Sequence, residues 1–98
     1  MKSFGEIVRE TRIEKKLELK QVQEETGIDY TLLSRIEKGD RIASKEQVFH
    51  LADYYELDKK TLLVAWHSDK IVKNIKGQDY SIVAEVLNCV KERIKAKV

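Results

Sequence analysis

Proline is absent from this 98-residue chain, cysteine occurs once and glycine four times. A proline-free chain that is 42% hydrophobic and 37% charged is typical of a helical globular protein with a solvated surface, rather than of a disordered chain. The single cysteine, Cys89, excludes an intrachain disulfide and the usual zinc site with several cysteine ligands. We therefore expect one compact helical domain with an appended helix, in a reducing compartment.

Long apolar runs and catalytic clusters are also absent. No stretch is apolar over the length of a membrane span, and no charged leader precedes an apolar segment. There is no glycine-rich phosphate loop and no nucleophile–base spacing, and His50 and His67 lack neighbouring ligand-type residues. We expect a cytoplasmic protein that is not an enzyme, with no catalytic residues, no metal and no cofactor.

Apolar residues recur at three- and four-residue spacing along most of the chain, which is the period of amphipathic helices. Glycines punctuate this pattern, and serine or aspartate stands where helices need an N-cap. Asp29 is the predicted N-cap of the third helix, and Ser44 with Gln47 is a predicted capping box for the fourth. The predicted helices run from Phe4 to Lys16, Lys20 to Thr26, about Tyr30 to Lys38, Ser44 onward, Asp58 to Gly77 as one helix or two, and Tyr80 to Val98. The expected fold class is therefore all-α with five or six helices.

The same pattern predicts whether individual apolar residues face the core. Ile13 continues the stripe that begins at Phe4, so it is expected on the core side of the first helix. Trp66 lies on an apolar stripe and is predicted to pack its helix onto the domain rather than to line a ligand pocket. Cys89 could be a redox switch or a cross-link between subunits, but we interpret it as a small buried hydrophobic residue.

Two short helices joined by a turn at Gly27 are the unit that can place its second helix in the DNA major groove. If Leu33 and Ile36 face inward, the opposite face of the 30–38 helix is polar and can reach base edges or phosphates. Arg35 has a planar fork that matches the two acceptors of guanine, which is worth about 1–3 kcal/mol of discrimination. Tyr30 and Thr31 can meet thymine methyl groups or phosphates.

The sequence resembles the Cro/CI-type (XRE) helix-turn-helix family over residues 4–57. The resemblance is carried by Gly27-Ile28-Asp29, Leu33-Ser34-Arg35-Ile36-Glu37 and Lys38-Gly39. It implies a lambda-repressor-like DNA-binding domain in a transcriptional regulator, and it gives Glu37 a structural role. By this resemblance the DNA-binding residues are Tyr30, Thr31, Ser34 and Arg35 on the base-facing side and Lys38 and Arg41 on the phosphate side.

Three positions depart from the family pattern. Leu19 stands where a glutamine often contacts phosphate, so that side-chain hydrogen bond is missing and only backbone N–H groups could serve there. Gln23 replaces a small alanine that usually permits tight helix packing. Ala43 replaces a common proline before the fourth helix.

The C-terminal segment carries a stripe of Ile82, Val86, Val90 and Ile94 at four-residue spacing. Left alone, this stripe would expose an apolar patch, and one helix-turn-helix buries too little surface for gene-scale specificity. We therefore divide the chain into a DNA-binding domain at 3–57 and a helical extension at 58–98 that forms a homodimer. The predicted partner is double-stranded DNA with a palindromic operator.

The charge is unevenly divided. Residues 1–58 carry 10 Lys and Arg against 13 Asp and Glu, a net charge of −3, whereas 59–98 carry 9 against 4, a net charge of +5. DNA binders usually rely on phosphate neutralisation, so an acidic domain favours an alternative hypothesis, a protein–protein module that binds a basic partner as an antitoxin does. The lysine-rich segment 91–97 could either contact DNA or provide solubility, and the sequence does not decide between these two roles.

Overall fold

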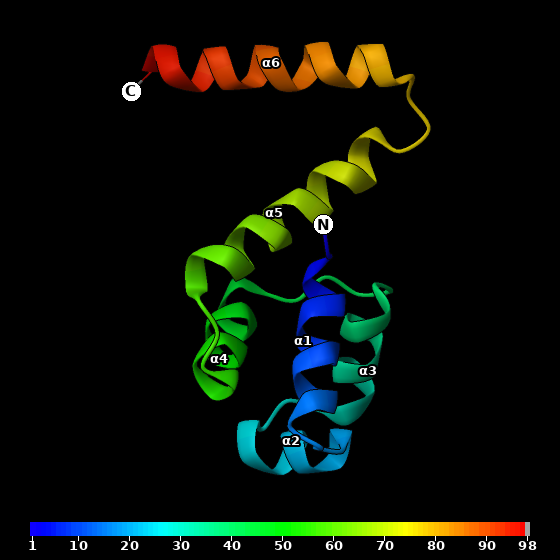
Figure 1. Ribbon diagram of the computed structural model, residues 1–98, viewed down its shortest axis with the longest axis vertical. Helices are drawn as coiled ribbons and strands as arrows, with labels where there is room; N and C mark the ends of the chain where they lie inside the picture. The colour runs from blue at the N-terminus through cyan, green and yellow to red at the C-terminus, as the bar shows by residue number, and fades with distance from the viewer. Residues whose placement is uncertain (98) are drawn as a thin grey trace.

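The computed structural model describes residues 1–97, and this part of the chain is helical with short connections (Figure 1). It confirms the predicted all-α fold and resolves the helix count to six. The segment after Asp58 forms one continuous helix. The helices are α1 (Phe4–Glu14), α2 (Leu19–Thr26), α3 (Tyr30–Lys38), α4 (Lys45–Tyr55), α5 (Lys59–Ile75) and α6 (Tyr80–Lys97).

Helix α1 begins at a capping box, because the Ser3 hydroxyl accepts from the backbone of Glu6 while the Glu6 side chain accepts from the backbone of Ser3. It ends at Glu14, two residues before the predicted end, since Lys16 has a positive φ of 58°. Ile13 was predicted to face the core and is exposed, so that prediction was wrong. Its side chain lies at the end of the helix, beyond the core that Phe4 and Val8 enter.

Helices α1 to α5 share one hydrophobic core. Helix α1 packs against α3, α4 and α5, while α2 packs against α3 and α4. Helix α4 begins after the predicted capping box of Ser44 and Gln47 and ends at Tyr55, where the next residue, Glu56, has a φ of 55°. The buried hydrophobic residues are Phe4, Val8, Val22, Ile28, Leu33, Ile36, Ala43, Val48, Leu51, Ala52, Tyr55, Leu62, Ala65 and Trp66.

Two hydrogen bonds tie α5 into this core. Trp66 is buried, as predicted, and its indole N–H donates to the carbonyl oxygen of Ala43 over 2.8 Å. Further along the same helix, Asp69 Oδ2 accepts from the backbone N–H of Phe4 over 3.0 Å at the start of α1. The first half of the segment predicted as an extension therefore belongs to the same core as residues 3–57, and the chain leaves that core after Asp69.

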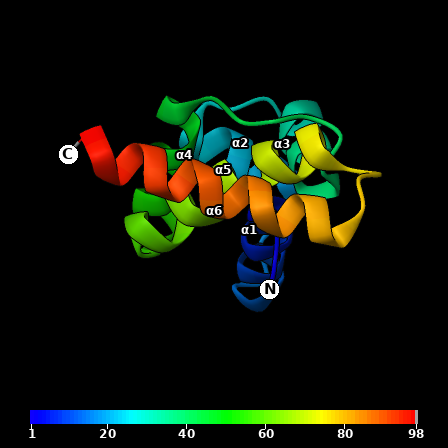
Figure 2. The same ribbon diagram turned by 90° about the horizontal axis from the view of Figure 1, so that it is seen from above.

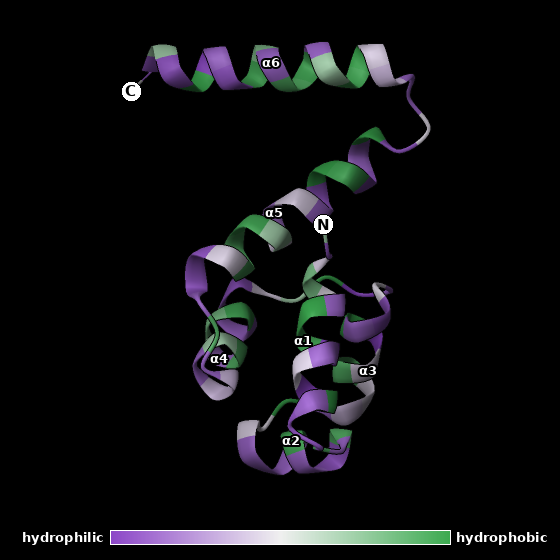
Figure 3. Cartoon of the chain, viewed as in Figure 1, coloured by the Kyte–Doolittle hydropathy of each residue, from purple (hydrophilic) through white to green (hydrophobic). Residues whose placement is uncertain are grey.

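Helix α6 stands apart from the other five in Figure 1, and seen from above it runs across the end of the bundle (Figure 2). None of its residues from Tyr80 to Lys97 is buried. Figure 3 shows hydrophobic residues along α6 that face no layer of the bundle over most of its length. Cys89 is exposed, so our interpretation of it as a buried residue was wrong. The reason is that the helix carrying it has too few neighbours within the chain to bury any side chain.

Candidate nucleic-acid interface

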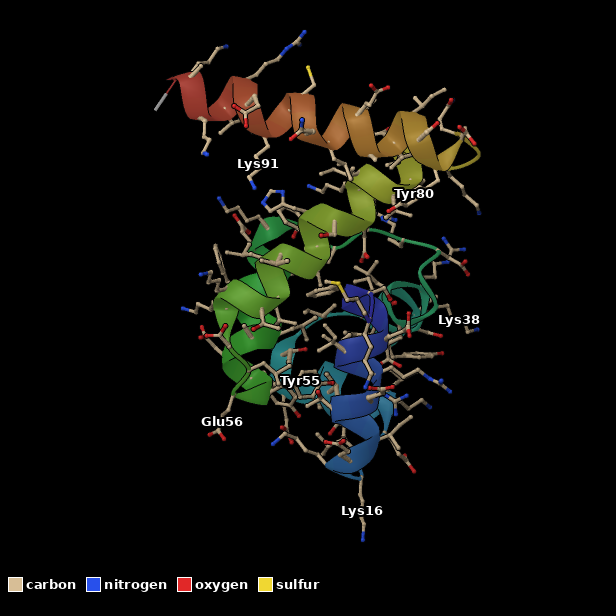
Figure 4. The ribbon with its side chains drawn as sticks, turned by 45° about the horizontal axis from the view of Figure 1, so that its top comes forward. Lys16, Lys38, Tyr55, Glu56, Tyr80 and Lys91 are labelled. Atoms are coloured by element: carbon tan, nitrogen blue, oxygen red, sulfur yellow. The ribbon has the colours of Figure 1, made fainter. Side chains whose placement is uncertain are left out.

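Helix α3 has one buried side and one exposed side. Leu33 and Ile36 are buried, 3% and 2% exposed, and Glu37 is buried beside them. The opposite side is polar and faces solvent, as the label at Lys38 shows in Figure 4. The predicted base-facing residues thus lie on one surface: Tyr30, Thr31 and Arg35 are exposed, and Ser34 is half-buried. Lys38, predicted to contact phosphate, is exposed at the end of the same surface.

The start of α3 is fixed by two side chains. Asp29 Oδ2 accepts from the backbone N–H of Thr31 at 3.0 Å and from that of Leu32 at 3.4 Å, which confirms the predicted N-cap. Gln23 Oε1, from α2, accepts from the backbone N–H of Tyr30 at 2.8 Å. The glutamine that departs from the family pattern therefore satisfies a free N–H of α3 and links the two helices of the motif.

The end of α3 turns back on itself through Gly39, which has a φ of 81°. The carbonyl oxygen of Arg35 accepts from the backbone N–H of Asp40 at 2.9 Å and from that of Arg41 at 3.3 Å. Farther along the loop, the carbonyl oxygen of Ala43 accepts the hydrogen bond from the Trp66 indole. These bonds place Arg41 directly after the exposed side of α3, on a loop anchored at both ends.

Behind α3, an ion pair and a glycine set its distance from α1. Arg12 Nε lies 2.8 Å from Glu37 Oε2, and Arg12 Nη2 lies 2.9 Å from Glu37 Oε1. The hydrogen bond that Arg12 donates to the Glu37 carboxylate raises the pKa of the guanidinium. A Cβ built on Gly5 would lie 2.3 Å from the carbonyl oxygen of Ile36, so only glycine allows this close approach. The exposed side of α3 is therefore presented on a rigid base.

The start of α2 adds one residue that the sequence did not single out. Leu19 is half-buried and packs against the core, so it has no polar role. Its neighbour Lys20 is exposed, and its Nζ lies 5.7 Å from the centroid of the Tyr30 ring. Lys20 therefore supplies a cation beside the missing glutamine. Its proximity to Tyr30 depends on how α2 crosses α3, which sequence spacing alone does not give.

The cations on this surface are available to an anionic partner. Among residues 1–97 the ion pairs are those of Lys2 with Glu10, Arg12 with Glu37, and Lys59 with Asp53. Arg35, Lys38 and Arg41 take part in none of them. The nearest acids in sequence are Glu37, which is paired with Arg12, and the exposed Asp40, which takes part in none of these ion pairs. The surface thus presents positive charge although the surrounding 1–58 segment is net negative.

A family model described as a helix-turn-helix domain matches residues 5–65. The match covers α1 to α4 and the buried first half of α5, which are the elements that form the base for α3. The chain belongs to the helix-turn-helix domain family. This family is one of the XRE-type helix-turn-helix families, which confirms the resemblance found in the sequence. No curated protein and no solved structure gave a significant match.

As a helix-turn-helix domain, this chain is of a class that binds DNA and regulates transcription. Helices α2 and α3 are the two helices of the motif, and α3 occupies the position of the recognition helix. None of the helices within residues 1–97 has the length and apolar character needed to cross a bilayer. The same residues contain no group of three His, Cys, Asp or Glu side chains placed to hold a metal ion.

Proposed function

We propose that this helix-turn-helix protein is a transcriptional regulator, a repressor or controller, that reads a palindromic operator as a homodimer. The supporting observation is the exposed polar side of α3, free of ion pairs and fixed from behind by the Arg12–Glu37 bond and by Gly5. A fixed helix of this kind fits the major groove, which admits one α-helix. The protein acts by binding in the cytoplasm, not by catalysis.

Each exposed residue of α3 has a proposed partner on the duplex. Arg35 donates two hydrogen bonds to a guanine, and Tyr30, Thr31 and Ser34 contact neighbouring base edges, thymine methyl groups or phosphates. Lys38 and Arg41, at the end of α3 and on the loop after it, donate to phosphates and set the register of the helix in the groove. Base discrimination therefore depends mainly on Arg35, and affinity depends on the cations around it.

The proposal of a second subunit is supported by apolar surface that stays exposed in a single chain. A groove of about 730 Å³ lies between α5 and α6, and its walls include Ile71, Val72 and Ile75 of α5 and Val83 and Leu87 of α6. The predicted stripe on α6 is exposed from end to end, with Val86 at 40% and Ile94 at 60%. A contiguous apolar surface of this kind on a small domain marks an interaction site.

We propose that α6 of a second copy covers this apolar surface. An isologous contact of α6 and the outer part of α5 with the same elements of a second copy would relate the two α3 helices by a two-fold axis. Two recognition helices about 34 Å apart, one duplex turn, read a palindrome. This arrangement makes the exposed stripe a buried surface without any change in the first five helices.

Selection from a random duplex pool tests the proposal. The full chain should enrich an inverted repeat, and its affinity for that repeat should fall steeply as salt is raised, because each neutralised phosphate releases counterions. The alternative, a module that captures a basic protein, is supported by the net negative charge of residues 1–58. Failure to enrich any duplex sequence, together with salt-insensitive binding of a basic protein, would favour that alternative.

A further inference from the structure

Beside the C-terminal end of α3 lies a depression of about 340 Å³ with three cations on its walls. Arg41 comes from the loop after α3, and Lys73 and Lys76 come from the last turn of α5 and the residue after it. Ile36 of the recognition helix and Gly39, directly after it, line the same depression. We call the three basic residues together the α5 cation cluster. The fold thus brings positive charge from outside the helix-turn-helix motif next to α3.

The α5 cation cluster has no anionic partner within the described chain. Arg41, Lys73 and Lys76 are exposed, and none of them belongs to the ion pairs found among residues 1–97. The acidic residue on the walls is Asp69, and its Oδ2 accepts from the backbone N–H of Phe4. Lys70, one turn from Lys73, lies over the Trp66 ring at 3.4 Å and is already engaged. Three positive charges against the one carboxylate of Asp69 leave the walls net positive, which favours the binding of an anion.

We propose that the α5 cation cluster binds the DNA backbone, as a second contact surface that flanks the recognition helix. This proposal rests on the proposed function, because the duplex must already lie on α3. A duplex held against α3 extends past the end of that helix, and a flanking phosphodiester group is the nearest anion that the protein would meet there. Arg41 belongs to both surfaces, so it connects the contact at α3 with the contact at α5.

The distribution of charge supports this occupant. Residues 1–58, which include the whole recognition helix, are net negative, whereas residues 59–98 are net positive. Phosphate neutralisation supplies much of the affinity of DNA-binding proteins, and the motif alone is poorly equipped for it. Lysines at the end of α5 add the missing charge without altering any base contact. They should therefore raise affinity for all duplexes alike and leave sequence preference unchanged.

The test measures affinity against salt for the full-length chain on the selected operator. The double variant Lys73→Ala and Lys76→Ala should bind more weakly, and the slope of log affinity against log salt should fall by about 0.9 for each phosphate that the variant no longer neutralises. Its ratio of operator to non-operator affinity should equal that of the wild type. The control is Lys15→Ala, which removes an exposed lysine just after α1, outside the depression and the groove between α5 and α6, and should leave the slope unchanged.

Duplex length separates a DNA phosphate from a free anion. On a duplex trimmed beyond the half-site, the Lys73 and Lys76 variant and the wild type should bind equally, because the flanking phosphates are gone. A difference that persists on the trimmed duplex and disappears with added inorganic phosphate at constant ionic strength would overturn the proposal in favour of a free-anion site. Equal slopes for wild type and variant on the long duplex would also overturn it. A wild-type chain that binds no DNA would reject the proposed function itself.

Discussion

Arg12 of α1 and Glu37 of α3 form a two-point ion pair whose side chains are 15% and 6% exposed. A third donor of the same guanidinium, Nη1, bonds the carbonyl oxygen of Leu17 at 2.9 Å. One side chain thus joins the end of α1, the connection to α2 and the buried side of the recognition helix. Three of the five guanidinium N–H groups and both carboxylate oxygens are hydrogen-bonded, which helps to offset the desolvation of the pair.

Removing one partner of this pair should destabilise the fold strongly. Arg12→Ala leaves the Glu37 carboxylate buried without its counterion, and the free energy of unfolding in urea should fall by about 3–5 kcal/mol. The matched control is Asp53→Ala, which breaks the exposed pair with Lys59 and should change it by less than about 1 kcal/mol. Similar effects of the two variants would show that the Arg12–Glu37 pair does not hold α3 in place.

Gly5 sets the separation of α1 and α3, so Gly5→Ala should force them apart. The added methyl group meets the backbone oxygen of Ile36, which cannot rotate away as a flexible side chain can. We expect the free energy of unfolding to fall by about 1–3 kcal/mol or more. The protein that remains folded should bind DNA more weakly. Gly27→Ala is the comparison, because its Cβ meets open space and its cost comes only from a φ of 79°. Thermal unfolding of both variants should show the larger loss for Gly5→Ala.

Alkaline pH should weaken the fold through Tyr54. Burial, with the hydrogen bond from its hydroxyl to Glu25 Oε2 at 2.6 Å, raises the pKa of Tyr54 to about 12. A raised folded pKa favours the neutral phenol, so this stabilisation is fully present below the unfolded pKa of about 10 and is lost as the pH rises toward 12.

Tyr54→Phe removes both the hydrogen bond and the titrating group. At pH 7 the free energy of unfolding of the variant should be lower than that of wild type by about 0.5–1.5 kcal/mol. This difference between the two proteins should become smaller above pH 10, as the wild-type phenol ionises. Denaturant unfolding of the two proteins at a series of pH values checks this. If the difference in free energy of unfolding between the two proteins stays constant up to pH 12, Tyr54 does not titrate with an altered pKa.

The C-terminal helix should control the oligomeric state. Truncation after Gly77 removes α6 but leaves the core intact, and it should convert a dimer into a folded monomer at micromolar concentration in the ultracentrifuge. Val86→Asp places a carboxylate on the apolar stripe and should do the same. Asn88→Asp introduces the same group on the opposite side of the helix and should leave the dimer intact. A dimer that survives truncation would locate the interface elsewhere.

Sequence periodicity was sufficient for the helices because their caps and apolar spacing are local. Asp29 and Gly39, which delimit α3, act within four residues of the backbone that they fix. The contacts that orient α3 are not local: Arg12 and Glu37 are 25 positions apart, and Phe4 and Asp69 are 65 apart. No spacing rule joins such pairs, since they depend on how helices cross. For the same reason, the contacts of Lys20 and Gln23 with Tyr30 could be found only in the structure.

The two wrong burial predictions have one physical origin. A helical stripe shows which side of a helix is apolar, but it does not show whether another element covers that side. Ile13 extends past the core at the end of α1, and Cys89 lies on a helix that the bundle does not cover. The exposed residues proposed to contact DNA were easier to place, because the inward positions of Leu33 and Ile36 leave only one side of α3 for them.

The most direct test of the account is a protein-by-DNA cycle at Arg35. Wild type and Arg35→Ala are titrated with the selected operator and with versions in which each guanine is replaced in turn, with Lys38→Ala as the phosphate-contact control. At one guanine position the wild type should lose about 1–3 kcal/mol on replacement and Arg35→Ala should lose nothing further, while Lys38→Ala binds every duplex more weakly by the same factor. If Arg35→Ala retains the wild-type preference at every guanine, the outward side of α3 does not read base pairs.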